Sequence, residues 1–190
     1  MSSSNRFDQS RKVDAERHAS TVRRLLADYY DIKEKLIVSV ESIHDGAYDT
    51  GGEFDAAHFL DYAGVDWLVD DRPAIVAIGE RLRPVKDGGT VDFSWRVNNG
   101  TSRPCEAVRV PAGLERVGGV APETILFGRY DSTNIRRAWL VDVESLLQLV
   151  ESGVGEVYDS PGGAQARYIS VPDLVTQNAV CDAWEVGVDD

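Results

Sequence analysis

The segment DYAGVDWLVDDRPAIVAIGERLRPVKDGGTVDFSWR, residues 61–96, indicates the fold class because it predicts consecutive strands joined by turns. Residues 64–69 and residues 74–83 are rich in Val and Ile, and the turn sequence Asp-Asp-Arg-Pro separates them. The first half of the second stretch is continuously apolar, which is typical of a strand buried on both faces in the middle of a sheet. Residues 90–97 alternate apolar and polar side chains, as a strand with one buried face does.

The N-terminal side of this segment predicts one long helix. Residues 11–38 repeat apolar side chains at helical spacing, with Arg and Lys between them. These basic side chains have two interpretations, a solvated face or a helix that lies along a phosphate backbone. Residues 1–10 have the composition of a flexible polar leader, and residues 84–89 have the Pro and Gly of a hairpin turn.

The C-terminal half predicts a further strand–helix–strand unit. Residues 137–143 and 167–171 have strand patterns, with a helix after the first of them. Residues 122–130 are ambiguous, and the Pro-Glu at their start favours a helix. The last residues, 186–190, end in Asp-Asp and fit an acidic tail. We therefore predict one α/β domain over residues 11–185, with a mixed central sheet flanked by helices.

The amino-acid composition indicates the class of protein and the compartment expected for this domain. The apolar share of 43% fits a folded protein, and no apolar run is long enough to span a membrane. Neither cysteine belongs to a metal-binding or disulfide spacing, and the N-terminus lacks a signal sequence, so we expect free thiols and a cytoplasmic protein. Low Lys, abundant Asp and abundant Val and Gly resemble the composition of proteins from salt-loving archaea.

The net charge affects whether this protein can bind nucleic acid. A charge of −12 would repel nucleic acid in an ordinary cytoplasm. In about 1 M salt the Debye length falls to roughly 3 Å, so this long-range repulsion would be screened. Residues 1–35 carry eight of the 20 basic residues, whereas Arg167 is the single base after residue 138. Any basic surface is therefore expected from the N-terminal helix and the middle of the chain.

A pattern of charged residues lies on these predicted strands and gives a family resemblance. It combines Asp61, Gly64 and Asp66 with Glu80-Arg81-Leu82-Arg83 after an apolar strand, and with Phe93 and Arg96 in the next strand. The segment resembles the core of the PD-(D/E)XK nuclease superfamily, in a divergent branch typical of phage and mobile-element proteins. The resemblance covers residues 60–97 and implies a restriction-endonuclease-like core and DNA as the partner.

The resemblance also implies a role for each charged residue. Carboxylate oxygens hold Mg²⁺ or Mn²⁺, the metal activates the nucleophile, and a fixed cation offsets the charge that develops on the phosphate. The catalytic residues would be Asp66, Glu80 and Arg81; the metal ligands would be Asp66, Glu80 and Asp61; and the substrate-binding residues would be Arg83 and Arg96.

One departure from the family pattern affects catalysis. The motif needs an acid and a Lys two residues apart, because only then do the two side chains share one strand face. Glu80 has Leu82 in the cation position, and Arg81 has Gly79 in the acid position. One solution is an acid from elsewhere, with Glu34, Glu123 and Asp61 as candidates. The other is that Arg81 and Arg83, on the face opposite Glu80, bind phosphate without catalysis.

Three interpretations stay open. The first is a metal-dependent DNA nuclease, for which the Asp66 carboxylate should meet Glu80 or Arg81 in one cleft near the N-terminal helix. The second is a catalytically inactive module of the same fold that binds DNA or a protein partner. The third is an unrelated α/β protein whose match is due to chance. The resemblance also makes a homodimer one option, and a context in a mobile element, defence or replication.

Overall fold

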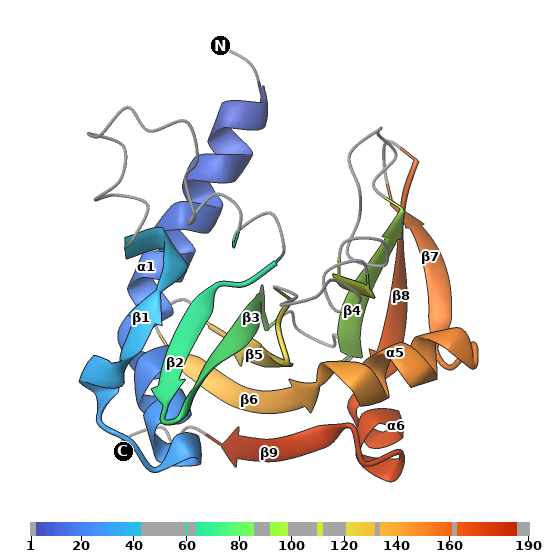
Figure 1. Cartoon of the computed structure of the whole chain (residues 1–190). Helices are drawn as coiled ribbons and strands as arrows, with labels where there is room; N and C mark the ends of the chain where they lie inside the picture. Colours follow the sequence, from blue (N-terminus) through green and yellow to red (C-terminus); the bar gives the residue numbers. More distant parts are fainter. Residues whose placement is uncertain are drawn as a thin grey trace.

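Strands dominate the chain after one long N-terminal helix (Figure 1). The computed structural model describes residues 3–42, 60, 64–85, 92–98, 110–111, 121–131, 134–160 and 163–185. The helices are α1 (Ser3–Tyr30), the 3₁₀ helix η1 (Glu34–Leu36), α5 (Val143–Glu151) and α6 (Val171–Thr176). The strands are β1 (Ile37–Ser39), β2 (Trp67–Asp71), β3 (Ala74–Pro84), β4 (Asp92–Asn98), β5 (Thr124–Tyr130), β6 (Ile135–Asp142), β7 (Glu156–Ser160), β8 (Ala164–Ser170) and β9 (Val180–Glu185).

These strands form two sheets. Sheet A has six strands in the order β1-β2-β3-β5-β6-β9, and sheet B has three in the order β4-β8-β7. Only β3 and β5 pair in parallel; the other paired strands in these two sheets are antiparallel. Sheet A is therefore a mixed sheet, and the α/β class predicted from the sequence is confirmed.

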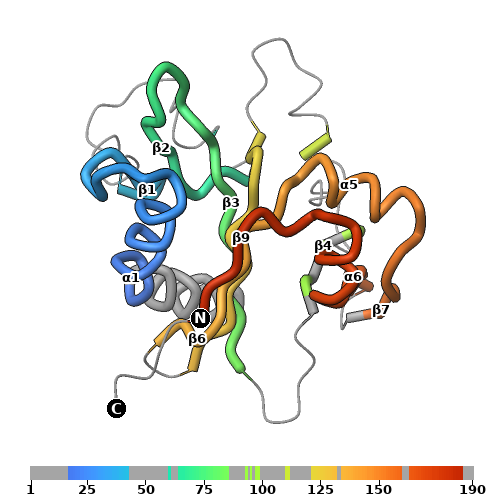
Figure 2. Tube along the Cα trace, turned by 90° about the horizontal axis from the view of Figure 1, so that it is seen from below, coloured from blue at the N-terminus to red at the C-terminus, as the bar shows by residue number. Residues whose placement is uncertain are grey.

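Sheet A separates two apolar cores. Helix α1 covers one side of the sheet, whereas sheet B, α5 and α6 lie on the other side (Figures 1 and 2). We call the side toward α1 the helix face and the side toward sheet B the second-sheet face. Along β5, Leu126 packs into the core under α1, whereas Ile125 and Phe127 pack into the core against sheet B. This alternation assigns each side chain of the neighbouring strands to one face.

Helix α1 ends earlier than the sequence pattern predicts. It runs over Ser3–Tyr30, so the prediction of a helix over residues 11–38 is wrong at both ends, and residues 3–10 belong to the helix and not to a leader. Asp31 has a positive φ of 50°, and the amide of Ile32 donates back to the Ala27 carbonyl at 3.1 Å. Asp tolerates this left-handed conformation, which satisfies a terminal carbonyl and stops the helix. The chain then enters η1 and β1.

The predicted three-strand meander is also corrected. Strand β4 does not follow β3 in a hairpin; it pairs with β8 in sheet B. The free edge of β3 is taken by β5, and β1 completes the antiparallel group on the other side of β2. Phe93 and Trp95 explain the change, because both are fully buried and the Phe93 ring lies 5.4 Å from Phe127 of sheet A. The aromatic face of β4 packs onto sheet A instead of extending it.

Several other expectations are tested by the element boundaries. The strand predictions at residues 64–69, 74–83, 137–143 and 167–171 are confirmed, as is the helix before residue 151. The helical start favoured for residues 122–130 is wrong, since Thr124–Tyr130 is the strand β5. Strand β9 is absent from the sequence-based prediction. No helix in the described ranges is both long enough and apolar enough to cross a membrane.

Candidate functional site

Asp66 stands where β2 begins, and its polar atoms connect three strands. Its carbonyl oxygen accepts from the amide of Val40, next to β1, and its amide donates to the carbonyl of Ile78 in β3, both at 2.9 Å. Its carboxylate oxygen Oδ2 accepts from the amide of Glu80 at 2.5 Å. Strand β3 continues past the start of β2, so this amide would otherwise lack a partner from β2. Asp66 thus acts as a charged cap on the strand ladder.

Glu80 directs its side chain to the helix face of β3. Its Oε2 accepts a hydrogen bond from the indole Nε1 of Trp67 at 2.8 Å. Burial, followed by the negative charge of Asp66, raises the pKa of Glu80 from 4.5 to about 7, although the Trp67 bond and the Arg81 charge act in the opposite direction. Near neutral pH a substantial fraction of this carboxyl group is therefore protonated.

Arg81 and Arg83 lie on the second-sheet face of β3, opposite the side chain of Glu80. Leu82 lies between them and packs against the core under α1. Because side chains alternate along a strand, the two arginines point to the opposite face. Each guanidinium donates to the carbonyl of the preceding residue, Arg81 to Glu80 at 2.8 Å and Arg83 to Leu82 at 3.2 Å. The alternation predicted for this strand is thus confirmed. It separates the candidate acid from the candidate cations.

Only two of the metal ligands inferred from the family resemblance, Asp66 and Glu80, can be placed in this geometry. Asp66 uses one carboxylate oxygen on a backbone amide, and Glu80 is largely buried against Trp67. Over the described ranges, no group of three or more His, Cys, Asp and Glu side chains could hold a metal ion. Asp61 lies outside the described residues.

Two of the three alternative acids considered from the sequence can be placed, and both are exposed. Glu34 is exposed in η1, and Glu123 is exposed just before β5. A different carboxylate, Glu41, is close enough for its charge to raise the pKa of Glu80. Sequence reasoning missed Glu41 because it follows β1, whose pairing with β2 has no local signal. The side chain of Arg96 lies outside the described residues, although its backbone belongs to β4.

Sequence reasoning also missed Arg129. In the parallel register of β3 and β5, Arg83 lies beside Arg129, and Arg81 lies beside Phe127. The Arg129 guanidinium carbon is 5.2 Å from the centroid of the Phe127 ring, a cation–π contact. The pairing joins segments that are distant in the sequence, so no local spacing could have revealed it.

The basic residues of α1 have structural contacts that the sequence did not predict. The Nε of Arg23 donates to the carbonyl of Ile37 at 3.3 Å, and its guanidinium carbon lies 5.7 Å from the Trp67 ring centroid. His18 is buried and packs against Tyr130, with ring centroids 4.7 Å apart. Arg24 is exposed, as expected of a solvated face. The described part of α1 thus contributes mainly to packing against sheet A.

Comparisons with protein-family models, with curated proteins and with solved structures gave no match. The function is therefore inferred from the residues and their geometry.

Proposed function

We propose that this chain is a non-catalytic module that binds nucleic acid and has a divergent nuclease-like fold. One observation carries the proposal: Glu80 projects from one face of β3, whereas Arg81 and Arg83 project from the other. A nuclease site needs its acid and its cation together at one phosphate. Arginines on their own still bind phosphate, because the guanidinium donates two parallel hydrogen bonds to phosphate oxygens.

The state of the carboxylates supports the non-catalytic part. Asp66 stabilises the end of the β2–β3 ladder, and the raised pKa of Glu80 reduces the share of its ionised form near neutral pH. Metal binding needs ionised ligands, so a proton on Glu80 competes with a cation. Both groups have a structural role that explains their positions without catalysis.

The nuclease-like fold is proposed at the level of a coarse arrangement. A long helix precedes an antiparallel group of three strands, and the acid Asp66 stands at the entry to the second of them. These features support the resemblance carried by residues 60–97. The third strand of that segment, β4, departs from the expected arrangement, because it pairs with β8 in sheet B instead of following β3.

One experiment tests the proposal. Wild type and Asp66→Asn are incubated with supercoiled plasmid in high salt, with Mg²⁺ and separately with Mn²⁺, and the same proteins are titrated into labelled DNA. We expect intact plasmid in every sample and equal DNA affinity for both proteins. The amide introduced by Asp66→Asn retains an oxygen for the Glu80 backbone N–H, so this variant changes charge with little loss of structure.

The second candidate is an active nuclease. It is favoured by the closeness of the two acids, because the backbone amide of Glu80 donates a hydrogen bond of 2.5 Å to the carboxylate of Asp66. Metal-dependent nicking by wild type that is absent in Asp66→Asn would establish it and overturn the non-catalytic proposal. Failure of wild type to bind DNA at all would overturn the nucleic-acid part.

A further inference from the structure

A β-bulge in β6 places two consecutive arginines on one side of sheet A. The register shifts so that Arg129 pairs with Arg137 and the next residue, Tyr130, pairs with Ile135. Arg136 is therefore the extra residue of the bulge. Ile135 and Ala138 both belong to the core under α1, so the two residues between them are turned to the second-sheet face.

The bulge completes a group of five arginines from three adjacent strands. Strand β3 contributes two, β5 contributes one that is in register with them, and β6 contributes two. We call this group the arginine face; its members are Arg81, Arg83, Arg129, Arg136 and Arg137. These are five of the 20 basic residues of a chain with a net charge of −12, so the positive charge is local and not a consequence of composition.

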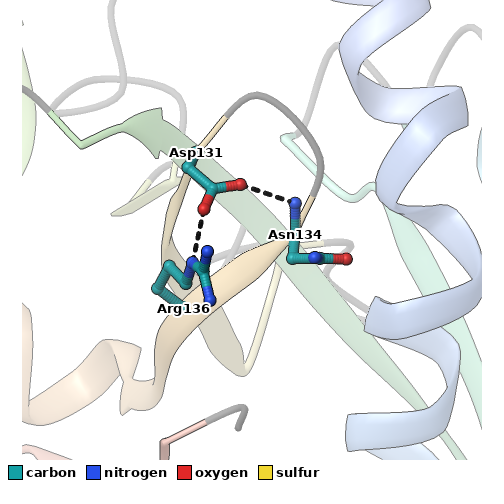
Figure 3. Close-up of polar contacts among 3 residues, drawn as sticks. All are labelled: Asp131, Asn134 and Arg136. Carbon is teal, nitrogen blue, oxygen red and sulfur yellow. Dashed lines mark hydrogen bonds and ion pairs between the residues drawn. The ribbon is translucent and has the colours of Figure 1, made fainter. Parts of the chain in front are cut away.

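Among the described residues, two acids form ion pairs with members of the arginine face. Arg136 forms an ion pair with Asp131, whose other carboxylate oxygen accepts from the amide of Asn134 at 2.9 Å (Figure 3). Asp131 thereby contacts both Asn134 and the bulge arginine. Arg137 lies 3.4 Å from Glu185 of β9, and this pair is open to solvent, with side chains 55% and 82% exposed. Solvent-open pairs of this kind exchange readily with other anions.

The spacing of the arginine face favours a ligand with several anionic groups. Neighbouring strands lie about 4.8 Å apart, and residues two apart on one strand lie about 6.6 Å apart. An extended chain of phosphates matches this spacing, because it would lie over several guanidiniums at once.

We propose that the arginine face binds successive phosphate groups of a nucleic-acid backbone. The inference rests on the proposed nucleic-acid function and extends it from Arg81 and Arg83 to a surface that includes Arg129, Arg136 and Arg137. Contacts to phosphate carry no base information, so binding is insensitive to sequence and strongly dependent on salt. Arginine supplies the geometry, since each guanidinium can contact one phosphate through two donors.

The test compares Arg83→Gln, Arg137→Gln and their double variant with wild type. Each protein is titrated over a salt series into a labelled duplex, into a labelled single strand of the same sequence, and into tripolyphosphate. We expect about a tenfold loss of nucleic-acid affinity for each single variant. We also expect the slope of log affinity against log salt to fall by about 1 for each arginine removed.

The matched control is Arg72→Gln. Arg72 is 82% exposed in the turn between β2 and β3, beyond the opposite end of β3 from Arg83, and removing it changes the net charge equally. If this control weakens binding as much as Arg83→Gln does, the arginine face is not the binding surface, although the nucleic-acid function stands. Binding of tripolyphosphate without binding of either nucleic acid would overturn both the nucleic-acid assignment and the proposed function.

A gain-of-affinity variant guards against effects of misfolding. Glu185 competes with an incoming phosphate for Arg137, so Glu185→Gln should tighten nucleic-acid binding about threefold to tenfold. A purely structural ion pair predicts no tightening. Unchanged or weaker binding by this variant, with an intact fold by circular dichroism, would contradict the proposal.

Discussion

The two faces of β3 carry charged residues in different surroundings. On the helix face, Glu80 is largely buried beside Trp67, and its pKa rises to about 7. On the second-sheet face, Arg81 and Arg83 stand within a group of five guanidiniums that stay charged at any physiological pH. One strand therefore carries a group that burial can neutralise and a group that it cannot.

The chemistry of the two groups explains how each charge is accommodated. A carboxyl group that is largely buried beside another carboxylate avoids much of the desolvation cost by taking up a proton. A guanidinium cannot lose its proton, so it requires carboxylates, carbonyls, solvent or an anionic ligand around it. We infer that Glu80 and Trp67 on the helix face of β3 serve stability, whereas the arginine face is the proposed binding surface. Substitutions on each face can test this division.

The largest expected effect is on the helix face. Trp67→Ala removes a buried indole and the hydrogen-bond donor of Glu80, so the free energy of unfolding should fall by about 3–5 kcal/mol. Urea denaturation monitored by circular dichroism measures it. The control Ile75→Ala, at a side chain of β3 that is 68% exposed, should change the value by less than about 0.5 kcal/mol. Equal effects at the two positions would contradict the assignment of the stabilising core.

The next effect is a pH dependence of stability set by Glu80. Its pKa in the folded state, about 7, lies above the ordinary value of 4.5, so the folded state holds the proton more tightly. The resulting stabilisation is complete below about pH 4.5 and is lost as the pH rises through 7, with an upper limit of roughly 3 kcal/mol. Urea unfolding of wild type between about pH 5 and about pH 8.5 measures the decline.

The matched variant for this effect is Glu80→Gln. Its amide oxygen can still accept from Trp67, but the side chain cannot ionise. We expect a smaller decline across the same pH range and a variant more stable than wild type at about pH 8.5. Parallel curves for the two proteins would show that other groups cause the pH dependence.

Asp66 connects the helix face with the strand ladder and should have an intermediate effect. Asp66→Asn keeps an acceptor for the Glu80 amide but loses the charge, so we expect a loss of about 1 kcal/mol in stability. The pKa of Glu80 should also fall, because the negative charge of Asp66 is its second cause of elevation. Repeating the pH series on this variant measures both effects. An unchanged midpoint would mean that the two carboxyl groups are not coupled.

Local sequence patterns predict strands β2 and β3 of sheet A well. They also predict which charged side chains lie on each of the two faces of β3. The apolar run within residues 74–83 indicates a buried strand, and its period of two places Glu80 opposite Arg81 and Arg83. The side of the fold that each residue faces thus follows from sequence alone once the strand is recognised.

Long-range pairing is not predictable in the same way. The parallel contact between β3 and β5 brings Arg129 beside Arg83, and the bulge adds Arg136 to the same face. Residues 122–130 are ambiguous in sequence because their strand identity depends on a tertiary partner, which overrides the local preference of Pro and Glu. The arginine face is therefore a product of topology and could not be inferred from spacing.

The smallest expected effect is on the stability contributed by the arginine face. Arg137 and Glu185 form an ion pair whose two side chains are open to solvent, and such pairs contribute about 0–1 kcal/mol. A double-mutant cycle with Arg137→Gln, Glu185→Gln and the combined variant should therefore give a coupling energy below about 1 kcal/mol in urea denaturation. The same single variants are expected to change nucleic-acid affinity in opposite directions. A small coupling energy together with opposed affinities would separate binding from folding on this face. A coupling above about 2 kcal/mol would mean that the arginines hold β6 to β9, and the division between a stabilising and a binding face would then fail.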